Sequence, residues 1–86
     1  MNLTKNTILI TGGTSGIGWV LGQKLLDMGN TVILLGRNKA KLEEAQNNGF
    51  HIIQCDLSNP ADIENAVLHI QNNFTEINML FNNAGV

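Results

Sequence analysis

The residues with the clearest chemical potential form a glycine-rich turn near the amino terminus. The segment Thr11-Gly12-Gly13-Thr14-Ser15-Gly16-Ile17-Gly18 lies between a short apolar run and a stretch with helical spacing. Gly12 permits a tight turn, Gly16 removes a side chain where a phosphate must approach the backbone, and Gly18 allows close helix packing. Unpaired N–H groups at the start of the following helix, together with its dipole, favour an anion there. The pattern therefore predicts a pyrophosphate-binding turn.

Strand-like and helix-like segments alternate along the chain and would position this turn. Apolar runs predict strands at 7–10, 31–35, 51–55 and 78–81, and apolar residues three and four apart predict helices at 15–28, 39–47 and 60–74. This alternation predicts an α/β fold with a parallel sheet and helices on both faces. A strand before the turn and a helix after it favour a dinucleotide site over a loop that merely has glycines at its bends.

Local signals predict where the helices begin, end and pack. Asn38 and Asn59 are expected to cap the second and third helices, and Gly29 and Gly49 to end the first and second. The acid Asp62 should lie on the helix surface, in a first turn where it suits the dipole. The apolar residues of the first helix should share one face, and those of the third repeat at helical spacing: Ile17, Val20, Leu21, Leu25 and Met28 in the first, and Ile63, Ala66, Val67, Ile70 and Phe74 in the third.

Two further segments extend the pattern of the glycine turn. Cys55-Asp56-Leu57 follows the third predicted strand, and Asn82-Asn83-Ala84-Gly85 follows the fourth. With the spacing Thr-Gly-x-x-x-Gly-x-Gly, the chain resembles the short-chain dehydrogenase/reductase family over its whole length. The resemblance implies that residues 1–86 are the N-terminal dinucleotide-binding part of a doubly wound Rossmann-type sheet, truncated to about four strands in the order 3-2-1-4.

The resemblance also implies cofactor contacts after the third and fourth strands. Asp56 and Leu57 would lie at the adenine edge, and the segment Asn83-Ala84-Gly85 would lie under the adenosine-side ribose. Thr11 would form a hydrogen bond to the turn that carries Asn83. The full set of expected cofactor-binding residues is Gly12, Thr14, Ser15, Gly16, Ile17, Gly18, Arg37, Asp56, Leu57, Asn83, Ala84 and Gly85.

The end of the second predicted strand indicates which dinucleotide is preferred. NAD-preferring folds place an acid about 20 residues beyond the glycines, where it accepts bonds from the ribose 2′-hydroxyl. Gly36 stands there instead, and Arg37 follows it. A guanidinium can hold a 2′-phosphate by paired, charge-assisted hydrogen bonds. The sequence thus predicts NADP(H) over NAD(H), with a solvated surface arginine as the alternative.

The chain contains no tyrosine. The resemblance implies hydride transfer between a nicotinamide and a carbonyl or alcohol, with a tyrosine, a lysine and a serine that lie beyond the Asn-Asn-Ala-Gly motif. No residue here is expected to be catalytic, and the 86 residues alone should be inactive. Three interpretations follow: the N-terminal part of a longer reductase, a stand-alone nucleotide-binding module, or a non-catalytic structural or interaction remnant.

The remaining reactive side chains favour structural roles. His51 and His69 have no partners at ligand spacing, so no metal site is expected. Cys55 is the single cysteine, which excludes an internal disulfide and a four-cysteine zinc site, and it should be a buried, inert thiol. Trp19 follows the glycines, where packing is favoured over covering the nucleotide.

Composition and charge narrow the partners. The chain has 86 residues, 43% of them hydrophobic, with five basic and seven acidic residues. Without a basic stripe, a nucleic-acid partner has little electrostatic support. No apolar run approaches the roughly 20 residues of a membrane span, and no signal peptide is recognisable, so a cytoplasmic protein is expected. The strand at 78–81 would leave an open apolar edge, which predicts a homo-oligomer, with that edge as the candidate interface.

Overall fold

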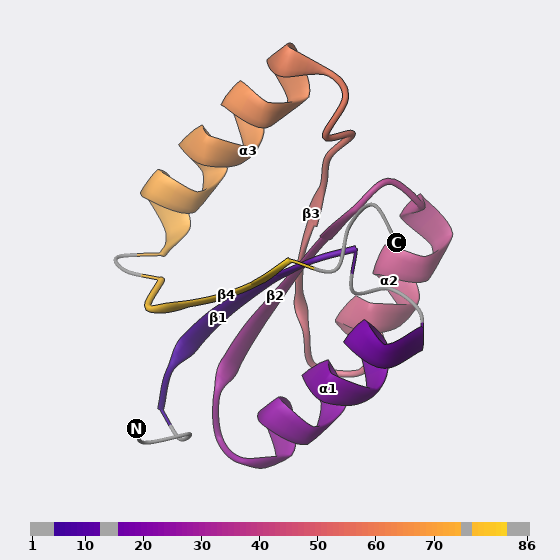
Figure 1. The fold of residues 1–86 in the computed structure, drawn as a ribbon, viewed down its shortest axis with the longest axis vertical. Helices are drawn as coiled ribbons and strands as arrows, with labels where there is room; N and C mark the ends of the chain where they lie inside the picture. The colour runs from indigo at the N-terminus through magenta and orange to yellow at the C-terminus, as the bar shows by residue number, and fades with distance from the viewer. Residues whose placement is uncertain (1–4, 13–15, 75–76, 83–86) are drawn as a thin grey trace.

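The computed structural model describes residues 5–12, 16–74 and 77–82. Within these residues, four strands alternate with three helices (Figure 1). The strands are β1 (Thr7–Thr11), β2 (Thr31–Gly36), β3 (His51–Gln54) and β4 (Met79–Asn82), and the helices are α1 (Gly16–Asp27), α2 (Lys39–Asn47) and α3 (Pro60–Asn73). Each predicted element is present, and its ends agree with the sequence prediction to within one residue.

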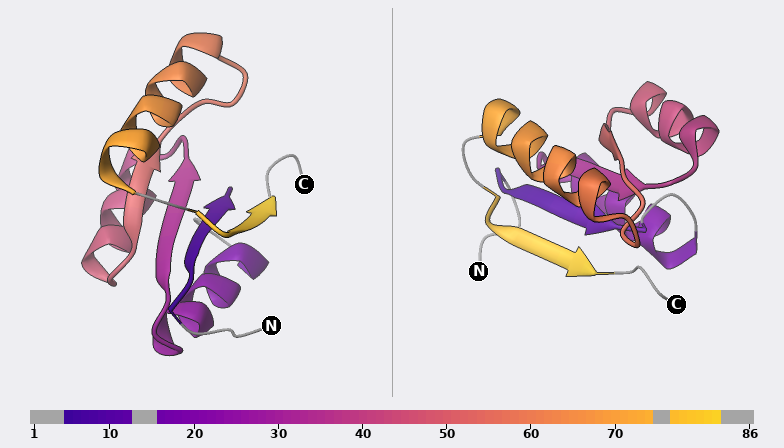
Figure 2. Two further views of the ribbon diagram at one scale, coloured as in Figure 1. Left: turned by 90° about the vertical axis from the view of Figure 1, so that its left-hand side faces the viewer. Right: turned by 90° about the horizontal axis from the view of Figure 1, so that it is seen from above.

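The strands form one parallel sheet in the order β3-β2-β1-β4. Ile8 lies opposite Val32 of β2 on one side and opposite Met79 of β4 on the other. Helices α1 and α2 cover one face of the sheet, and α3 lies over the other (Figure 2). The predicted Rossmann-type α/β fold with strand order 3-2-1-4 is confirmed.

Alternation along the strands divides the core into two layers. Successive side chains of a strand point to opposite faces, so a central strand covered on both faces is apolar throughout. In β2 the fully buried Val32 and Leu34 face α1 and α2, whereas Ile33 and Leu35 face α3. Each such side chain contributes about 1.5–3 kcal/mol when it leaves water. This continuous burial fixes β2 as the centre of the fold.

The predicted helix caps are present. The side chain of Asn38 accepts a hydrogen bond from the N–H of Lys41 over 3.1 Å, and Asn59 accepts from the first turn of α3. Gly29 and Gly49 follow α1 and α2 with φ of 90° and 100°, a left-handed conformation that glycine adopts without strain. These four residues therefore set the limits of the helices as predicted.

The apolar residues assigned to one face of α1 are not all buried. Val20 is 55% exposed and Met28 is 42% exposed. The helix instead turns Gly18, Gly22 and Leu25 inward. A Cβ added at Gly22 would lie 2.8 Å from the Phe50 ring, so this glycine permits the close approach of helix and core. The apolar pattern missed the face because two of its residues have no side chain.

The apolar residues that predicted α3 are also only partly buried. Ala66 is buried, and Ile70 and Phe74 pack on the layer beneath the helix, but Ile63 and Val67 are 39% and 47% exposed. Only one face of α3 can contact the sheet, and no described element covers its outer side. The spacing of the apolar residues predicted the helix, but it could not show which of them pack against the sheet.

Asparagines join the elements at the amino ends of β1 and β4. Asn78 accepts a hydrogen bond from the N–H of Thr7 over 3.0 Å and donates to the Asn6 side chain over 2.8 Å. The buried Asn30 accepts from the N–H of Asn6 and donates to the carbonyl of Leu25. Buried polar groups are costly unless paired, so these bonds fix the end of the sheet opposite the glycine turn.

None of the helices in the described ranges is long and apolar enough to cross a membrane.

Candidate functional site

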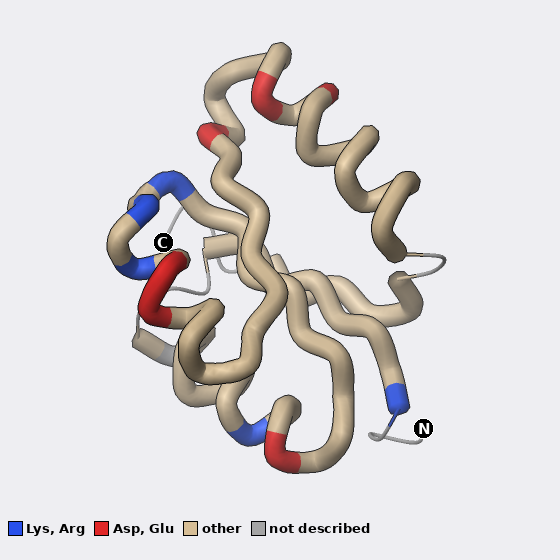
Figure 3. The backbone as a smooth tube through the Cα atoms, turned by 180° about the vertical axis from the view of Figure 1, so that it is seen from behind, with Lys and Arg blue, Asp and Glu red and all other residues tan. Residues whose placement is uncertain are grey.

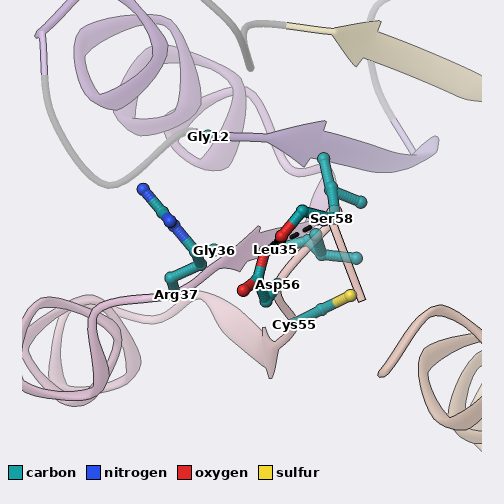
Figure 4. A pocket seen from close by; sticks show the side chains of 8 residues that line it. Gly12, Leu35, Gly36, Arg37, Cys55, Asp56 and Ser58 are labelled. Carbon is teal, nitrogen blue, oxygen red and sulfur yellow. Dashed lines mark hydrogen bonds between the residues drawn. The ribbon is translucent and has the colours of Figure 1, made fainter. Parts of the chain in front are cut away.

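A cavity of about 270 Å³ lies where β1, β2 and β3 end side by side (Figure 4). Two backbone hydrogen bonds hold its walls together, from Gly12 N–H to the Leu35 carbonyl and from Cys55 N–H to the Gly36 carbonyl, each 2.8 Å long. Ligands of open α/β sheets bind at this carboxyl edge. The residues that line the cavity are Gly12, Leu35, Gly36, Arg37, Cys55, Asp56, Leu57 and Ser58.

The glycine turn enters the cavity wall through Gly12. Gly12 and Gly16 have φ of 67° and 63°, a conformation that favours glycine at both positions. A Cβ added at Gly16 would meet no atom within 4 Å, so the first residue of α1 faces open space. The first turn of α1 contains no acidic residue. Its N–H groups therefore lie in a setting suited to an anion.

Several of the expected site residues fall on segments that the structure leaves out. Thr14 and Ser15 of the glycine turn lie outside the described residues, as do Asn83, Ala84 and Gly85, and the side chain of Ile17 is not described. Gly18 is buried in α1. Of the predicted set, the structure brings Gly12, Arg37, Asp56 and Leu57 together around one cavity.

Arg37 is exposed at the start of the loop between β2 and α2. Its side chain extends from this loop toward the segment that contains Gly12 (Figure 4). Lys39 and Lys41 follow it, so positive charge gathers around the beginning of α2 (Figure 3). The Gln54 side chain donates to the Arg37 carbonyl over 3.3 Å and ties this loop to β3. The structure thus presents a cation at the rim of the cavity.

Asp56 contributes a carboxylate to the lining of the same cavity. Its Oδ1 accepts hydrogen bonds from the Ser58 hydroxyl over 2.6 Å and the Ser58 N–H over 2.9 Å. These bonds hold the pKa of Asp56 below its ordinary value, and the charge of Arg37 makes a smaller contribution in the same direction. Asp56 is therefore ionised at neutral pH and acts only as an acceptor.

One donor and one acceptor in this loop remain available. Within the described part of the chain, Oδ2 of Asp56 and the N–H of Leu57 form no hydrogen bond with another residue. The two groups belong to consecutive residues that line the same cavity. An unpaired donor beside an unpaired acceptor can recognise a planar polar ligand edge that presents the complementary pair.

Asp62 holds the backbone of this loop, a role that its predicted place on the helix surface did not indicate. Its Oδ2 accepts a hydrogen bond from the N–H of Asp56 over 3.0 Å, while the N–H of Asn59 donates to the Asp56 carbonyl over 2.9 Å. Asp62 lies in the first turn of α3 as predicted, but it is only partly exposed, because its carboxylate binds a backbone N–H six residues earlier in the chain. An acid at the third position of a helix was the available signal.

The other reactive side chains have the structural roles that were favoured. Cys55 is 1% exposed at the floor of the cavity, and burial, reinforced by the charges of Asp62 and Asp56, raises the pKa of its thiol. His51 packs edge-on against Phe74 with the ring centroids 5.3 Å apart. Trp19 packs against Phe50 at 5.2 Å, so it belongs to the core of the α1 layer.

The carboxyl ends of β1 and β4 are joined by side chains. The hydroxyl of Thr11 donates a hydrogen bond to Oδ1 of Asn82 over 2.9 Å. Asn82 is the first residue of the Asn-Asn-Ala-Gly segment and the last of β4. The strands that precede the glycine turn and this segment are therefore hydrogen-bonded to each other at their carboxyl ends.

A parallel sheet with a cavity at its carboxyl edge is an arrangement that this chain shares with proteins of one family. Residues 6–86 match the family described as short chain dehydrogenase. The chain belongs to this family. It is 41% identical over 88 residues to the "uncharacterized oxidoreductase DltE" of Bacillus subtilis, covering 100% of this chain and 35% of that protein. It is 32% identical to the NADP-dependent 3-hydroxy acid dehydrogenase YdfG of Escherichia coli K12, covering 92% of this chain and 33% of YdfG.

Solved structures of this family share the fold. A short chain dehydrogenase of Bacillus anthracis is 32% identical to this chain, with a TM-score of 0.84. The match covers 96% of this chain and 36% of the Bacillus anthracis chain. L-sorbose reductase of Gluconobacter frateurii, solved with NADPH and L-sorbose, is 26% identical with a TM-score of 0.84, over 100% of this chain and 35% of its own. The chain therefore spans about a third of the length of these relatives, and it has the fold with which the family binds nicotinamide dinucleotides.

Proposed function

We propose that this chain binds NADP(H), as the dinucleotide-binding part of a short-chain dehydrogenase/reductase that transfers a hydride between the nicotinamide and a carbonyl or alcohol. The observation that carries the proposal is the cavity at the carboxyl edge. Arg37 lines this cavity together with Gly12 and Asp56. Strand β2, which precedes Arg37, contains no acidic residue. One relative by sequence is named as NADP-dependent, and one protein with this fold was solved with NADPH.

The start of α1 would hold the pyrophosphate. Its orphan N–H groups and dipole favour negative charge, and Gly16 leaves open space in front of them. The predicted contacts from Thr14, Ser15 and the Ile17 backbone belong to this same turn. Because the binding groups are backbone N–H groups, no lysine is required at this point.

The loop after β3 would recognise the adenine. Adenine offers a ring nitrogen acceptor beside an exocyclic amine donor. The N–H of Leu57 and Oδ2 of Asp56 provide the reverse order, and both line the cavity. The pairing needs an ionised Asp56, which the bonds from Ser58 favour. The segment Asn83-Ala84-Gly85 is proposed to support the adjoining ribose, as the resemblance implies.

Arg37 would distinguish NADP(H) from NAD(H). A 2′-phosphate gains charge-assisted hydrogen bonds from a guanidinium, whereas a carboxylate at the end of β2 would repel it. Gly36 precedes Arg37 and contributes no charge, while Lys39 and Lys41 add positive charge nearby. The alternative of a solvated surface arginine predicts equal affinity for the two dinucleotides.

Nicotinamide supplies the hydride chemistry when the dinucleotide is bound. This chain contains no tyrosine, so none of its residues is proposed as the proton donor. Its part in the reaction would be to bind the dinucleotide and hold its adenosine half. A stand-alone nucleotide-binding module is the alternative, and it would show the same binding without turnover.

The test is a comparison of NADP⁺ and NAD⁺ binding by isothermal titration calorimetry. The wild-type chain is expected to bind NADP⁺ at least about tenfold more tightly, which corresponds to one charge-assisted contact. Arg37→Asp should reverse this order. Lys24→Asp, the same charge change in the last turn of α1, should leave it unchanged. Equal affinities in wild type and Arg37→Asp would overturn the assignment of Arg37, and no saturable binding of either would overturn the dinucleotide site.

We also propose that the 86 residues self-associate along β4. This strand pairs with β1 alone among the described strands, and Leu80 is 63% exposed on it. An open apolar edge favours pairing with a second chain. Sedimentation should show a dimer or a larger species that Leu80→Lys dissociates. A monomer at micromolar concentration would contradict this interface.

A further inference from the structure

We propose that Asp62 is a positioning residue that makes the site selective for a 6-aminopurine over a 6-oxopurine. Through its bond to the Asp56 backbone, Asp62 would fix the order in which the loop presents a donor and an acceptor to the base. The inference rests on the proposed dinucleotide function and assigns a role to a residue that does not line the adenine cavity itself.

The geometry of Asp62 differs from that of an ordinary helix cap. An acid at the third helical position usually accepts from the N–H of the capping residue. In this chain that N–H, from Asn59, donates to the Asp56 carbonyl over 2.9 Å. The carboxylate of Asp62 instead accepts the N–H of Asp56 over 3.0 Å, in partly buried surroundings. Asp62 therefore acts on the loop that precedes the helix.

The bond removes one donor from the site. With the N–H of Asp56 held by Asp62 and that of Ser58 held by Asp56, the N–H of Leu57 is the only backbone donor left among residues 56–58 in the described structure. The free Oδ2 of Asp56 remains the acceptor. The loop is thus restricted to one donor and one acceptor in a fixed order.

Removal of the Asp62 acceptor would free a second donor and release the loop. Adenine presents a ring acceptor and an amine donor, whereas hypoxanthine presents a ring N–H and a carbonyl oxygen, which is the opposite order. A loop held in one conformation rejects the opposite order because polar groups would stay unpaired. A released loop can shift to satisfy either base, so selectivity should fall.

The test measures the affinity of four chains for NADP⁺ and for its hypoxanthine analogue, nicotinamide hypoxanthine dinucleotide phosphate. Wild type is expected to prefer NADP⁺ by at least about tenfold. Asp62→Ala should reduce this preference to less than about threefold. Asp62→Asn keeps an oxygen acceptor while losing the charge, so it should retain the wild-type preference. Glu64→Ala removes an exposed acid from the same helix and should also retain it.

The outcomes separate this inference from the proposed function. Tight NADP⁺ binding with an unchanged preference in Asp62→Ala would overturn the role of Asp62 alone, whereas absence of NADP⁺ binding in wild type would overturn both. Amide hydrogen exchange tests the underlying bond without a ligand. The N–H of Asp56 should be protected in wild type and Asp62→Asn and lose at least about tenfold in protection in Asp62→Ala. Unchanged protection in Asp62→Ala would overturn the inference.

Discussion

Thr11 and Asn82, which are 71 residues apart in the chain, meet through a 2.9 Å hydrogen bond from hydroxyl to amide oxygen. The bond closes the carboxyl end of the β1–β4 pair, next to the cavity wall formed by Gly12. The partner of Thr11 is the last residue of β4, and the turn that carries Asn83, to which a bond was expected, lies outside the described residues. The two strands that carry the glycine turn and the Asn-Asn-Ala-Gly segment therefore share a fixed spacing at the site.

Thr11→Val tests this spacing, because valine keeps the β-branched shape and removes the hydroxyl donor. A side-chain hydrogen bond contributes about 0.5–1.5 kcal/mol, so chemical denaturation should show a loss of that size. NADP⁺ affinity should fall about three- to tenfold. Thr7→Val, at the other end of β1, is the matched control. An unchanged affinity in Thr11→Val would show that the site does not depend on this bond.

Signals that act over a few residues predicted most of the fold. Asn38 and Asn59 cap helices and Gly29 ends one because these effects need only adjacent backbone groups. Alternation of the elements predicted the parallel sheet, whereas the strand order was implied by the family resemblance alone. The caps and the parallel sheet depend on adjacent residues or on the order of elements, so a single sequence contains enough information for them.

Features that depend on distant neighbours were not predictable in the same way. Val20 fits the apolar face of α1 by spacing, yet it is exposed because Gly22, not Val20, faces the Phe50 ring. Asp62 reads as a surface acid until its partner, the N–H of Asp56, is known. Of the site, Arg37 and Asp56 could be named from the sequence, but the hydrogen bonds that orient Asp56 required the three-dimensional structure.

Gly22→Ala should destabilise the fold by about 1–3 kcal/mol, the usual effect of overpacking a core. The new Cβ would lie 2.8 Å from one ring carbon of Phe50 and 3.0 Å from another. Phe50 is 3% exposed and packs against Trp19, so its ring has little room to move. Thermal unfolding followed by circular dichroism measures the effect.

A second substitution identifies the cause of that effect. Phe50→Leu removes ring atoms from the contact, so Gly22→Ala should be less destabilising in that background than in wild type. Strictly additive effects of the two substitutions would show that the Phe50 contact is not responsible for the loss of stability.

Ser58→Ala should raise the pKa of Asp56 toward its ordinary value of 3.8, because the hydroxyl bond is the largest cause of the shift. A carboxyl whose pKa is lower in the folded chain stabilises the fold above its unfolded value, and this contribution is lost as the pH falls through the folded value. The loss of folding stability that the wild type shows below about pH 4 should therefore be smaller in Ser58→Ala. Carbon-detected NMR titration of the Asp56 carboxyl measures the pKa directly.

Ser58→Thr serves as the matched variant for this titration. Threonine also carries a hydroxyl on its Cβ, so this variant should preserve the lowered pKa of Asp56. If Ser58→Ala titrates like the wild type, the hydrogen bond from the Ser58 hydroxyl is not the origin of the acidity of Asp56.

The pairing of β1 with β4 also has a consequence for the order of folding. Strands β1, β2 and β3 join neighbours that are close along the chain, whereas β4 must close a loop of about seventy residues to reach β1. The entropy of loop closure makes such a contact slow to form. Strand β4 should therefore dock last, and the segment that begins at Asn82 should join the glycine turn only at that step. A nucleotide that contacts both segments would bind the fully docked state and would report the completion of folding.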